Sequence, residues 1–262
     1  MFEVADRRLR TKVKGSVMIT TTLTTVVSAE MIRAHLKSLS PGQLQNPGND
    51  IDFLDIVLRQ KKASAKRTDW SVEEEAGTKR YRSEAGADGS PGKMGFPTQN
   101  FIACLVGAGR YVKAGKQQIS TAKSTILFEF LDFPEDFCVF KDTDKDGNIP
   151  WHGFLAKGNL DSGGKKVAVA IVRPRIPHWE TTVTVRLDTK RGIKRETVIQ
   201  MIETAGRKIG LCDWNPIHKG RFGRFIISKL EVLPIKDEKV EIPVVEYELT
   251  DAPAELKALA GV

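Results

Sequence analysis

The sequence predicts an α+β protein with a ferredoxin-like (RRM-like) core, in which two helices cover one face of an antiparallel sheet. Segments rich in β-branched residues alternate with two segments whose apolar residues recur at helical spacing. With residues 40–95 set aside as an insertion, the predicted order is β-α-β-β-α-β. A chain of 262 residues with 40% hydrophobic residues can also bury a sizeable core. We therefore expect a core from 1–39 and 96–233, an inserted flap at 40–95 and a tail at 234–262.

The core is expected to begin with a strand followed by a short helix. Residues 12–27 are rich in Val, Ile and Thr, which favour strands. Ser28 is a suitable N-cap for a helix that extends to residue 39, where a Pro-Gly pair follows. Ala29, Ile32 and Leu36 would share one face of that helix.

Residues 40–95 are predicted to form a basic flap that is flexible in part. Pro, Gly, Asn and Ser are frequent, and the second half carries several Lys and Arg around Trp70 and Tyr81. A linker of this length inside a compact domain is usually functional or disordered. Both a solvated surface loop and a flap that orders on nucleic acid are consistent with this composition.

The first main helix is expected to open at Pro97, with Thr98 as its cap and Gly115 at its end. Its buried stripe would consist of Phe101, Ile102, Leu105, Ala108 and Val112. A polar, basic stretch follows, in which Lys116 and Lys123 are candidates for phosphate contacts.

Four strand candidates come next, at 126–130, 137–140, 167–172 and 181–187. The linker between the last two contains Arg173 and Arg175. Pro174 and Pro177 would restrict its backbone and present both guanidinium groups with little entropy to lose. Trp179, at the start of the last of these strands, is expected to lie in the core.

The second helix is predicted over 196–209 and the final strand begins at 225. Gly210 is suited to the helix C-terminus because glycine adopts positive φ without a Cβ clash. The apolar stripe of this helix comprises Val198, Met201, Ile202, Ala205 and Ile209. Beyond the final strand, an edge strand at 243–249 and a short helix at 253–259 are expected.

Residues 211–224, which we call the basic loop, connect this helix to the final strand. Its cations include Lys219, Arg221 and Arg224, against one acid, Asp213. It also contains Gly220, Gly223, Trp214 and Phe222. Glycines and cations suit the approach of a phosphate backbone, and aromatic rings suit stacking on bases. In the alternative interpretation this is a solvated turn whose two aromatic residues fill the core.

Charge is unevenly distributed along the chain. Eight acidic and three basic residues lie between Leu230 and Val262, so this region carries −5. The rest of the chain then carries +13, given +8 for the whole. A basic body favours anionic partners, and an acidic tail could dock on the basic surface of another copy.

Cysteine usage and hydropathy favour a cytoplasmic protein. Three widely spaced cysteines do not form a disulfide framework or a metal-ligand pattern. The N-terminus is charged, and the apolar runs are too short for a membrane span. We expect no membrane association, no cofactor and no metal.

Catalytic and metal motifs are weak in this sequence. Residues 142–149 begin like a calcium-binding loop, but the twelfth position is Gly153 where a bidentate glutamate is needed. An acidic turn explains the same residues. The chain has no G-x-S-x-G motif and no phosphate-binding P-loop. His35 and His218 are the weak candidates for a general base.

The helix, the basic loop of the form G-x-x-D-x-x-P-x-x-x-G-x-F-G-x-F and the final strand resemble the RAMP superfamily, the ferredoxin-like RNA-binding subunits of CRISPR effector complexes. The matching positions are Gly210, Gly220, Phe222, Gly223 and Phe225. The resemblance extends to the insertion after the first strand and the proline-opened helix, as in the backbone subunit. It implies an RNA-binding protein that assembles along a guide RNA, in the family or in a phage or mobile-element relative. We find no counterpart of the aspartate that makes some members cleave RNA, and no duplicated domain.

The sequence therefore predicts a non-catalytic nucleic-acid-binding subunit, with RNA more favoured than DNA, that multimerises as a homo-oligomer or helical assembly. Other effector subunits are further candidate partners. A metal-independent endoribonuclease of the same fold and a phage structural or interaction protein are the alternatives. The predicted contact residues are Lys116, Lys123, Arg173, Arg175, Trp214, Lys219, Gly220, Arg221, Phe222, Gly223 and Arg224.

Overall fold

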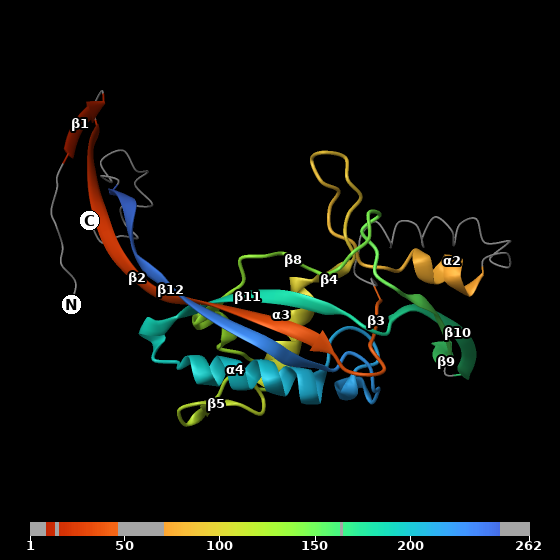
Figure 1. The fold of residues 1–262 in the computed structure, drawn as a ribbon. Helices are drawn as coiled ribbons and strands as arrows, with labels where there is room; N and C mark the ends of the chain where they lie inside the picture. The colour runs from red at the N-terminus through yellow and green to blue at the C-terminus, as the bar shows by residue number, and fades with distance from the viewer. Residues whose placement is uncertain (1–8, 14–15, 47–70, 163–164, 247–262) are drawn as a thin grey trace. The chain divides into compact units, whose positions relative to one another are not determined.

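The computed structural model describes residues 9–13, 16–46, 71–162 and 165–246 (Figure 1). The chain divides into two compact units, Met1–Ala29 with Pro234–Val262, and Glu30–Leu233. Two long strands, β2 (Ser16–Ser38) and β12 (Phe225–Glu246), contribute residues to both. In the first unit, β1 (Leu9–Val13) pairs antiparallel with the beginning of β2, from Leu9 opposite Thr20 to Val13 opposite Ser16.

The predicted helix at 28–39 is wrong, because this segment continues β2. Ile32, Ala34 and Leu36 are buried, whereas Arg33 between them and Lys37 after them are exposed. This alternation has the period of two that a strand imposes. The apolar residues at 29, 32 and 36 also fit a helical face, and pairing with neighbouring strands decides between the two.

The larger unit, Glu30–Leu233, is built on a sheet with the order β12–β2–β11–β7. It includes β11 (Glu180–Asp188), in which the predicted strand is confirmed, and the short β7 (Leu131–Asp132). The Ser38 amide donates to the Trp179 carbonyl and the Leu39 amide to the Arg224 carbonyl, each at 2.9 Å. The end of β2 therefore lies beside the starts of β11 and β12. The result is a mixed α and β architecture with antiparallel sheets.

Two helices bury their apolar stripes against this sheet. These are α3 (Thr98–Ala108) and α4 (Arg195–Thr204), which continues as a π-helical segment over Ala205–Ile209. Phe101 of α3 and Met201 of α4 share one buried cluster with Val185 of β11. Trp179 belongs to the same cluster, as predicted, and its ring meets Phe96, Phe140 and Phe225.

The ends of α3 differ from the prediction. Thr98 is the first helical residue and is buried, while Pro97 occupies the N-cap position without a side-chain hydrogen bond. The helix ends at Ala108 and not at Gly115. A short hairpin of β5 (Lys113–Ala114) and β6 (Gln117–Gln118) follows. Gly109 packs so closely on this connection that a Cβ there would lie 2.4 Å from Ser120 Oγ.

The strands between residues 126 and 176 were predicted in part. The segment 126–130 is a 3-10 turn, η1 (Leu127–Glu129), so that strand is wrong. The next candidate is confirmed as β8 (Phe137–Val139), which pairs with β4 (Gly95–Pro97). The third lies in β10 (Lys165–Ile176). That strand pairs antiparallel with β9 (His152–Ser162) and with β3 (Gln43–Leu44). Neither β9 nor β3 was among the predicted strands.

The described parts of the predicted insertion are folded and belong to the larger unit. Helix α2 (Val72–Gly77) begins with a capping box formed by Ser71 and Glu74. Leu44 and Met94 are fully buried. Residues 47–70 of the predicted basic flap lie outside the described residues, as do the predicted helix at 253–259 and the end of the acidic tail. No helix in the described ranges is both long enough and apolar enough to cross a membrane.

Candidate functional site

The basic loop has a backbone fixed by its own hydrogen bonds. It begins after Gly210, whose φ of +79° confirms the predicted helix end. The buried Asn215 side chain donates to the carbonyls of Gly210 and Cys212 at 3.1 and 3.0 Å. Its own oxygen accepts from the His218 amide at the 3-10 turn η4 (Pro216–His218). One asparagine therefore holds both sides of the loop together.

Gly220 and Gly223 are required for closure of the loop. A Cβ on Gly220 would lie 1.7 Å from the Trp214 carbonyl oxygen, and one on Gly223 would lie 1.9 Å from that of Leu211. Gly223 also has a φ of +77°, and its amide donates to Gly42 at 2.8 Å. Both glycines are therefore needed because two segments of backbone lie too close together for a side chain.

Phe222, predicted to stack on bases, lies inside the protein. Phe222 is 4% exposed, and its ring packs edge-on against Phe154 at 5.4 Å. Trp214 meets the same ring at 6.1 Å and is half-buried. Because these aromatic rings hold the basic loop on β9, Phe222 is an anchor and presents no face to a ligand.

Three cations of the basic loop point to solvent. Lys219, Arg221 and Arg224 are exposed, and none forms an ion pair with any residue that the structure describes. The Arg224 carbonyl is held by the Leu39 amide, and the Arg221 guanidinium lies 5.9 Å from the Phe222 ring. The loop therefore presents three uncompensated positive charges on a fixed backbone.

The two arginines of β10 are each engaged by other parts of the protein. Arg173 Nε lies 2.8 Å from Asp213 Oδ2, and its side chain is only 17% exposed. Arg175 Nε donates to the Pro41 carbonyl at 3.1 Å. Both lie within β10, although they were predicted in the linker that follows a strand at 167–172. Arg173 neutralises the one acid of the basic loop and ties that loop to β10.

Lys116 and Lys123 are exposed but belong to another part of the unit. Lys116 lies in the turn between β5 and β6, and Lys123 in the loop that follows. Figure 1 shows the β5 hairpin apart from the basic loop, the blue segment beyond α4. The phosphate contacts predicted for Lys116 and Lys123 would therefore be separate from those of the basic loop.

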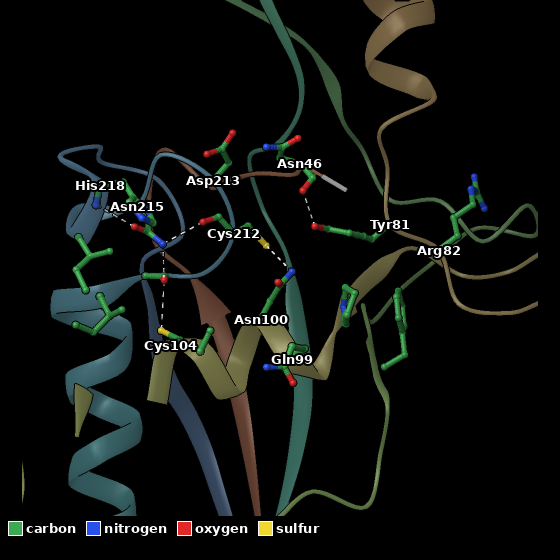
Figure 2. Close-up of a pocket in the computed structure, with 16 residues that line it drawn as sticks. Asn46, Tyr81, Arg82, Gln99, Asn100, Cys104, Cys212, Asp213, Asn215 and His218 are labelled. Atoms are coloured by element: carbon green, nitrogen blue, oxygen red, sulfur yellow. Dashed lines mark hydrogen bonds between the residues drawn. The ribbon is translucent and has the colours of Figure 1, made fainter. Parts of the chain in front are cut away.

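A cavity of about 620 Å³ opens between the basic loop and the first turns of α3 (Figure 2). Its lining comes from chain segments far apart in the sequence, so no local motif could have indicated it. Residues from these segments include Asn46, Tyr81, Gln99, Asn100, Phe137, Cys212, Asn215 and His218. Of these, only His218 was predicted as a site residue.

The thiols in this cavity are not nucleophiles at neutral pH. Burial raises the pKa of the Cys212 thiol to about 12, and the nearby Asp213 carboxylate adds to the effect. Burial also raises the pKa of Cys104, whose Sγ–H donates to the Ala205 and Gly210 carbonyls. Both thiols therefore stay protonated at pH 7.

We expect iodoacetamide to alkylate Cys212 in the native protein at pH 8 far more slowly than in the unfolded chain. Only the thiolate reacts, and a pKa raised from 9.0 to about 12 lowers the thiolate fraction by about a factor of 1,000 at that pH. Mass spectrometry of the site follows the rate, with the same protein in urea as the control. Equal rates in the two states would contradict the assignment.

The two candidate histidines lie in different settings. His35 projects from β2, with Nε2 3.3 Å from Glu231 Oε1 and Nδ1 3.0 Å from Lys141 Nζ. Both ring nitrogens are engaged, so His35 is not a free base. Glu231 has a lowered pKa because it accepts hydrogen bonds from Lys229 and His35. His218 is exposed at the rim of the cavity.

The acidic segment at 142–149 is a turn. Asp144 Oδ1 accepts from the amides of Asp146 and Asn148 at 2.9 and 2.8 Å, which lowers the pKa of Asp144. Within the ranges that the structure covers, no group of three or more His, Cys, Asp or Glu could hold a metal ion.

No protein-family model matches the chain, and no curated protein matches it.

Proposed function

We propose that this protein binds single-stranded nucleic acid, RNA in preference to DNA, without cleaving it, and that several copies assemble along the strand. The observation that carries the proposal is the group of Lys219, Arg221 and Arg224, exposed and without ion pairs among the described residues, on a loop fixed by Asn215, Gly223 and Phe222. Cations held on a rigid backbone lose little entropy when they meet phosphates.

We further propose that the core is ferredoxin-like. The order β12–β2–β11–β7 supports this, because the four strands in chain order would be numbered 4-1-3-2 across the sheet. Helix α3 follows β2, and α4 connects β11 to β12, as a β-α-β-β-α-β path requires. This path delivers the basic loop to the start of the last strand, beside the end of the first.

The choice of RNA and of a repeated assembly rests on the resemblance to the RAMP superfamily. The charge distribution supports assembly, because a region of −5 and a remainder of +13 would attract between copies. Binding without cleavage is supported by the engaged ring nitrogens of His35 and the protonated thiols beside His218.

Replacing Lys219, Arg221 and Arg224 together by Gln should weaken binding of a 20-nucleotide RNA and flatten its salt dependence. Each lost phosphate contact lowers the slope of log K against log salt by about 0.7 for a single strand, so the triple variant should lose about 2. Fluorescence anisotropy at NaCl concentrations from about 50 to about 300 mM measures the affinity for RNA and its dependence on salt.

The matched control replaces Lys190, Arg191 and Lys194, three exposed cations before α4, by Gln. It removes the same charge at the opposite end of that helix and should leave the slope unchanged. If both triple variants weaken binding equally, the loop has no special part in it. If neither does, or if no salt-sensitive binding occurs, the chain is an interaction protein.

The assembly and the choice of RNA are tested separately. Light scattering on RNA of increasing length should show particles that grow with the strand and collapse on ribonuclease treatment. DNA of the same sequence should bind more weakly at equal salt. Equal affinity would contradict the RNA preference, and a particle size independent of strand length would contradict the repeated assembly.

A further inference from the structure

We propose that the cavity beside the basic loop receives one nucleobase of the bound strand and recognises its edge through the side-chain amides of Gln99 and Asn100. The inference rests on the proposed function and extends it from phosphate contact to base recognition. It is drawn from the unused hydrogen-bonding capacity of these amides, from the mostly uncharged lining and from the position of the cavity next to the exposed cations.

The cavity has room for a base together with its sugar. Its volume of about 620 Å³ lies within the range of small-molecule sites, about 300–1,000 Å³. Pro97, Phe137 and Ile217 supply apolar lining. A base needs such apolar surface for its two faces and polar groups for its edge.

Two amide side chains in the cavity retain hydrogen-bonding capacity. Asn100 Nδ2 meets only Cys212 Sγ, at 3.7 Å, and sulfur is a weak acceptor. Neither Asn100 Oδ1 nor the Gln99 side chain has a hydrogen-bond partner in the described part of the chain. An amide presents a donor and an acceptor in one plane, which matches the edge of a base. By contrast, the side-chain amide of Asn215 is already hydrogen-bonded to the backbone of Gly210, Cys212 and His218.

The charges around the cavity favour an uncharged ligand group over a phosphate. Asp213 is paired with Arg173. Arg82 is engaged at its guanidinium by Asn148 and by the Gly92 and Asp146 carbonyls. Figure 2 shows the Arg82 side chain directed away from Asn100. With both thiols protonated and Asp213 paired, Arg82 keeps the positive charge in the lining, and its side chain lies away from Asn100.

The cavity lies where a strand held by the basic loop would place a base. Ile217 and His218 line it, and the exposed Lys219 is the next residue along the chain. Consecutive Cα atoms are about 3.8 Å apart. A phosphate held at Lys219 would therefore lie close to the rim of the cavity, with its nucleoside beside the opening.

Ala103→Trp is the decisive variant, because Ala103 lines the cavity from an exposed position on α3 and an indole would fill the space. The probes are a 20-nucleotide oligouridine RNA and a ribose-phosphate strand of equal length without bases. Wild type should bind the base-bearing strand about 10-fold more tightly, as contacts to a base in a protein site provide. Ala103→Trp should reduce that ratio to about 1 while the salt slope stays unchanged.

The control for bulk is Ala122→Trp, at an exposed position in the loop after β6, which should retain the ratio. Gln99→Ala, also at an exposed position, should reduce the ratio about 3-fold without a large indole, so it tests the site should Ala103→Trp not fold.

Three outcomes would overturn the inference. Equal wild-type affinity for the two strands, with salt-sensitive binding intact, would remove the base site and leave the proposed function standing. A ratio that neither Ala103→Trp nor Gln99→Ala changes would place base contacts elsewhere, for example at Trp214. Absence of salt-sensitive binding to either strand would overturn the proposed function, and the base site with it.

Discussion

Gly223→Ala is expected to lower the free energy of unfolding of the Glu30–Leu233 unit by about 3 kcal/mol or more and to weaken nucleic-acid binding. A methyl group at this position would lie 1.9 Å from the Leu211 carbonyl oxygen and 2.6 Å from the Leu211 nitrogen. Those atoms cannot retreat easily, because the Leu211 amide donates to the Gly223 carbonyl at 2.8 Å. The φ of +77° adds the left-handed penalty of about 1–2 kcal/mol. Urea denaturation measures the loss, and anisotropy with RNA measures the binding.

Gly192→Ala is the matched control for this substitution. Gly192 has a φ of +72°, nearly the same as that of Gly223, but nothing lies within 4 Å of the position where its Cβ would be. It should therefore lose only the backbone penalty, about 1–2 kcal/mol, and bind RNA as wild type does. Equal losses in the two variants would mean that the Leu211 contact does not constrain the loop.

Phe222→Leu and Phe222→Ala are expected to separate an anchoring role from a stacking role. Phe222 is 4% exposed and packs on Phe154, so truncation to Ala should cost about 3 kcal/mol of stability, with the loss of the loop and of binding. Leucine restores most of the apolar volume, and the loop should hold. We therefore expect Phe222→Leu to bind RNA within about 2-fold of wild type, because no base–ring contact is lost.

Thermal unfolding and anisotropy on the same samples check this prediction. Phe128→Ala is the control, since Phe128 is 60% exposed and its truncation should change stability by no more than about 0.5 kcal/mol. A stable Phe222→Leu variant that binds RNA 10-fold or more weakly, on the order of one lost stacking contact, would restore the stacking role.

Two mistaken elements show how local patterns mislead. The apolar residues at 29, 32 and 36 fit a helix, and those at 32, 34 and 36 fit a strand equally well. The pairing of β2 with β11 and β12 decides for the strand, because those partners satisfy its backbone groups on both sides. Likewise, the apolar 126–130 segment becomes a 3-10 turn beside the short β7, although its composition suits a strand.

Elements whose signals are local can be predicted from the sequence. The spacing of apolar residues predicts the stripes of α3 and α4, and the β-branched segments predict the strands β8, β10 and β11. Glycine chemistry predicts the helix end at Gly210 and the position of the basic loop. Exposure of Lys219, Arg221 and Arg224 also follows, since unpaired cations stay in water.

Which of the predicted site residues are exposed depends on contacts between distant segments of the folded chain. Arg173 turns inward because Asp213, 40 residues away, neutralises it, and Phe222 turns inward because Phe154 covers its ring. The cavity depends on the same kind of contact, since Asn100 and Cys212 meet across 112 residues of chain. Burial and pairing are properties of residues brought together by folding, so a pattern read along the chain cannot supply them.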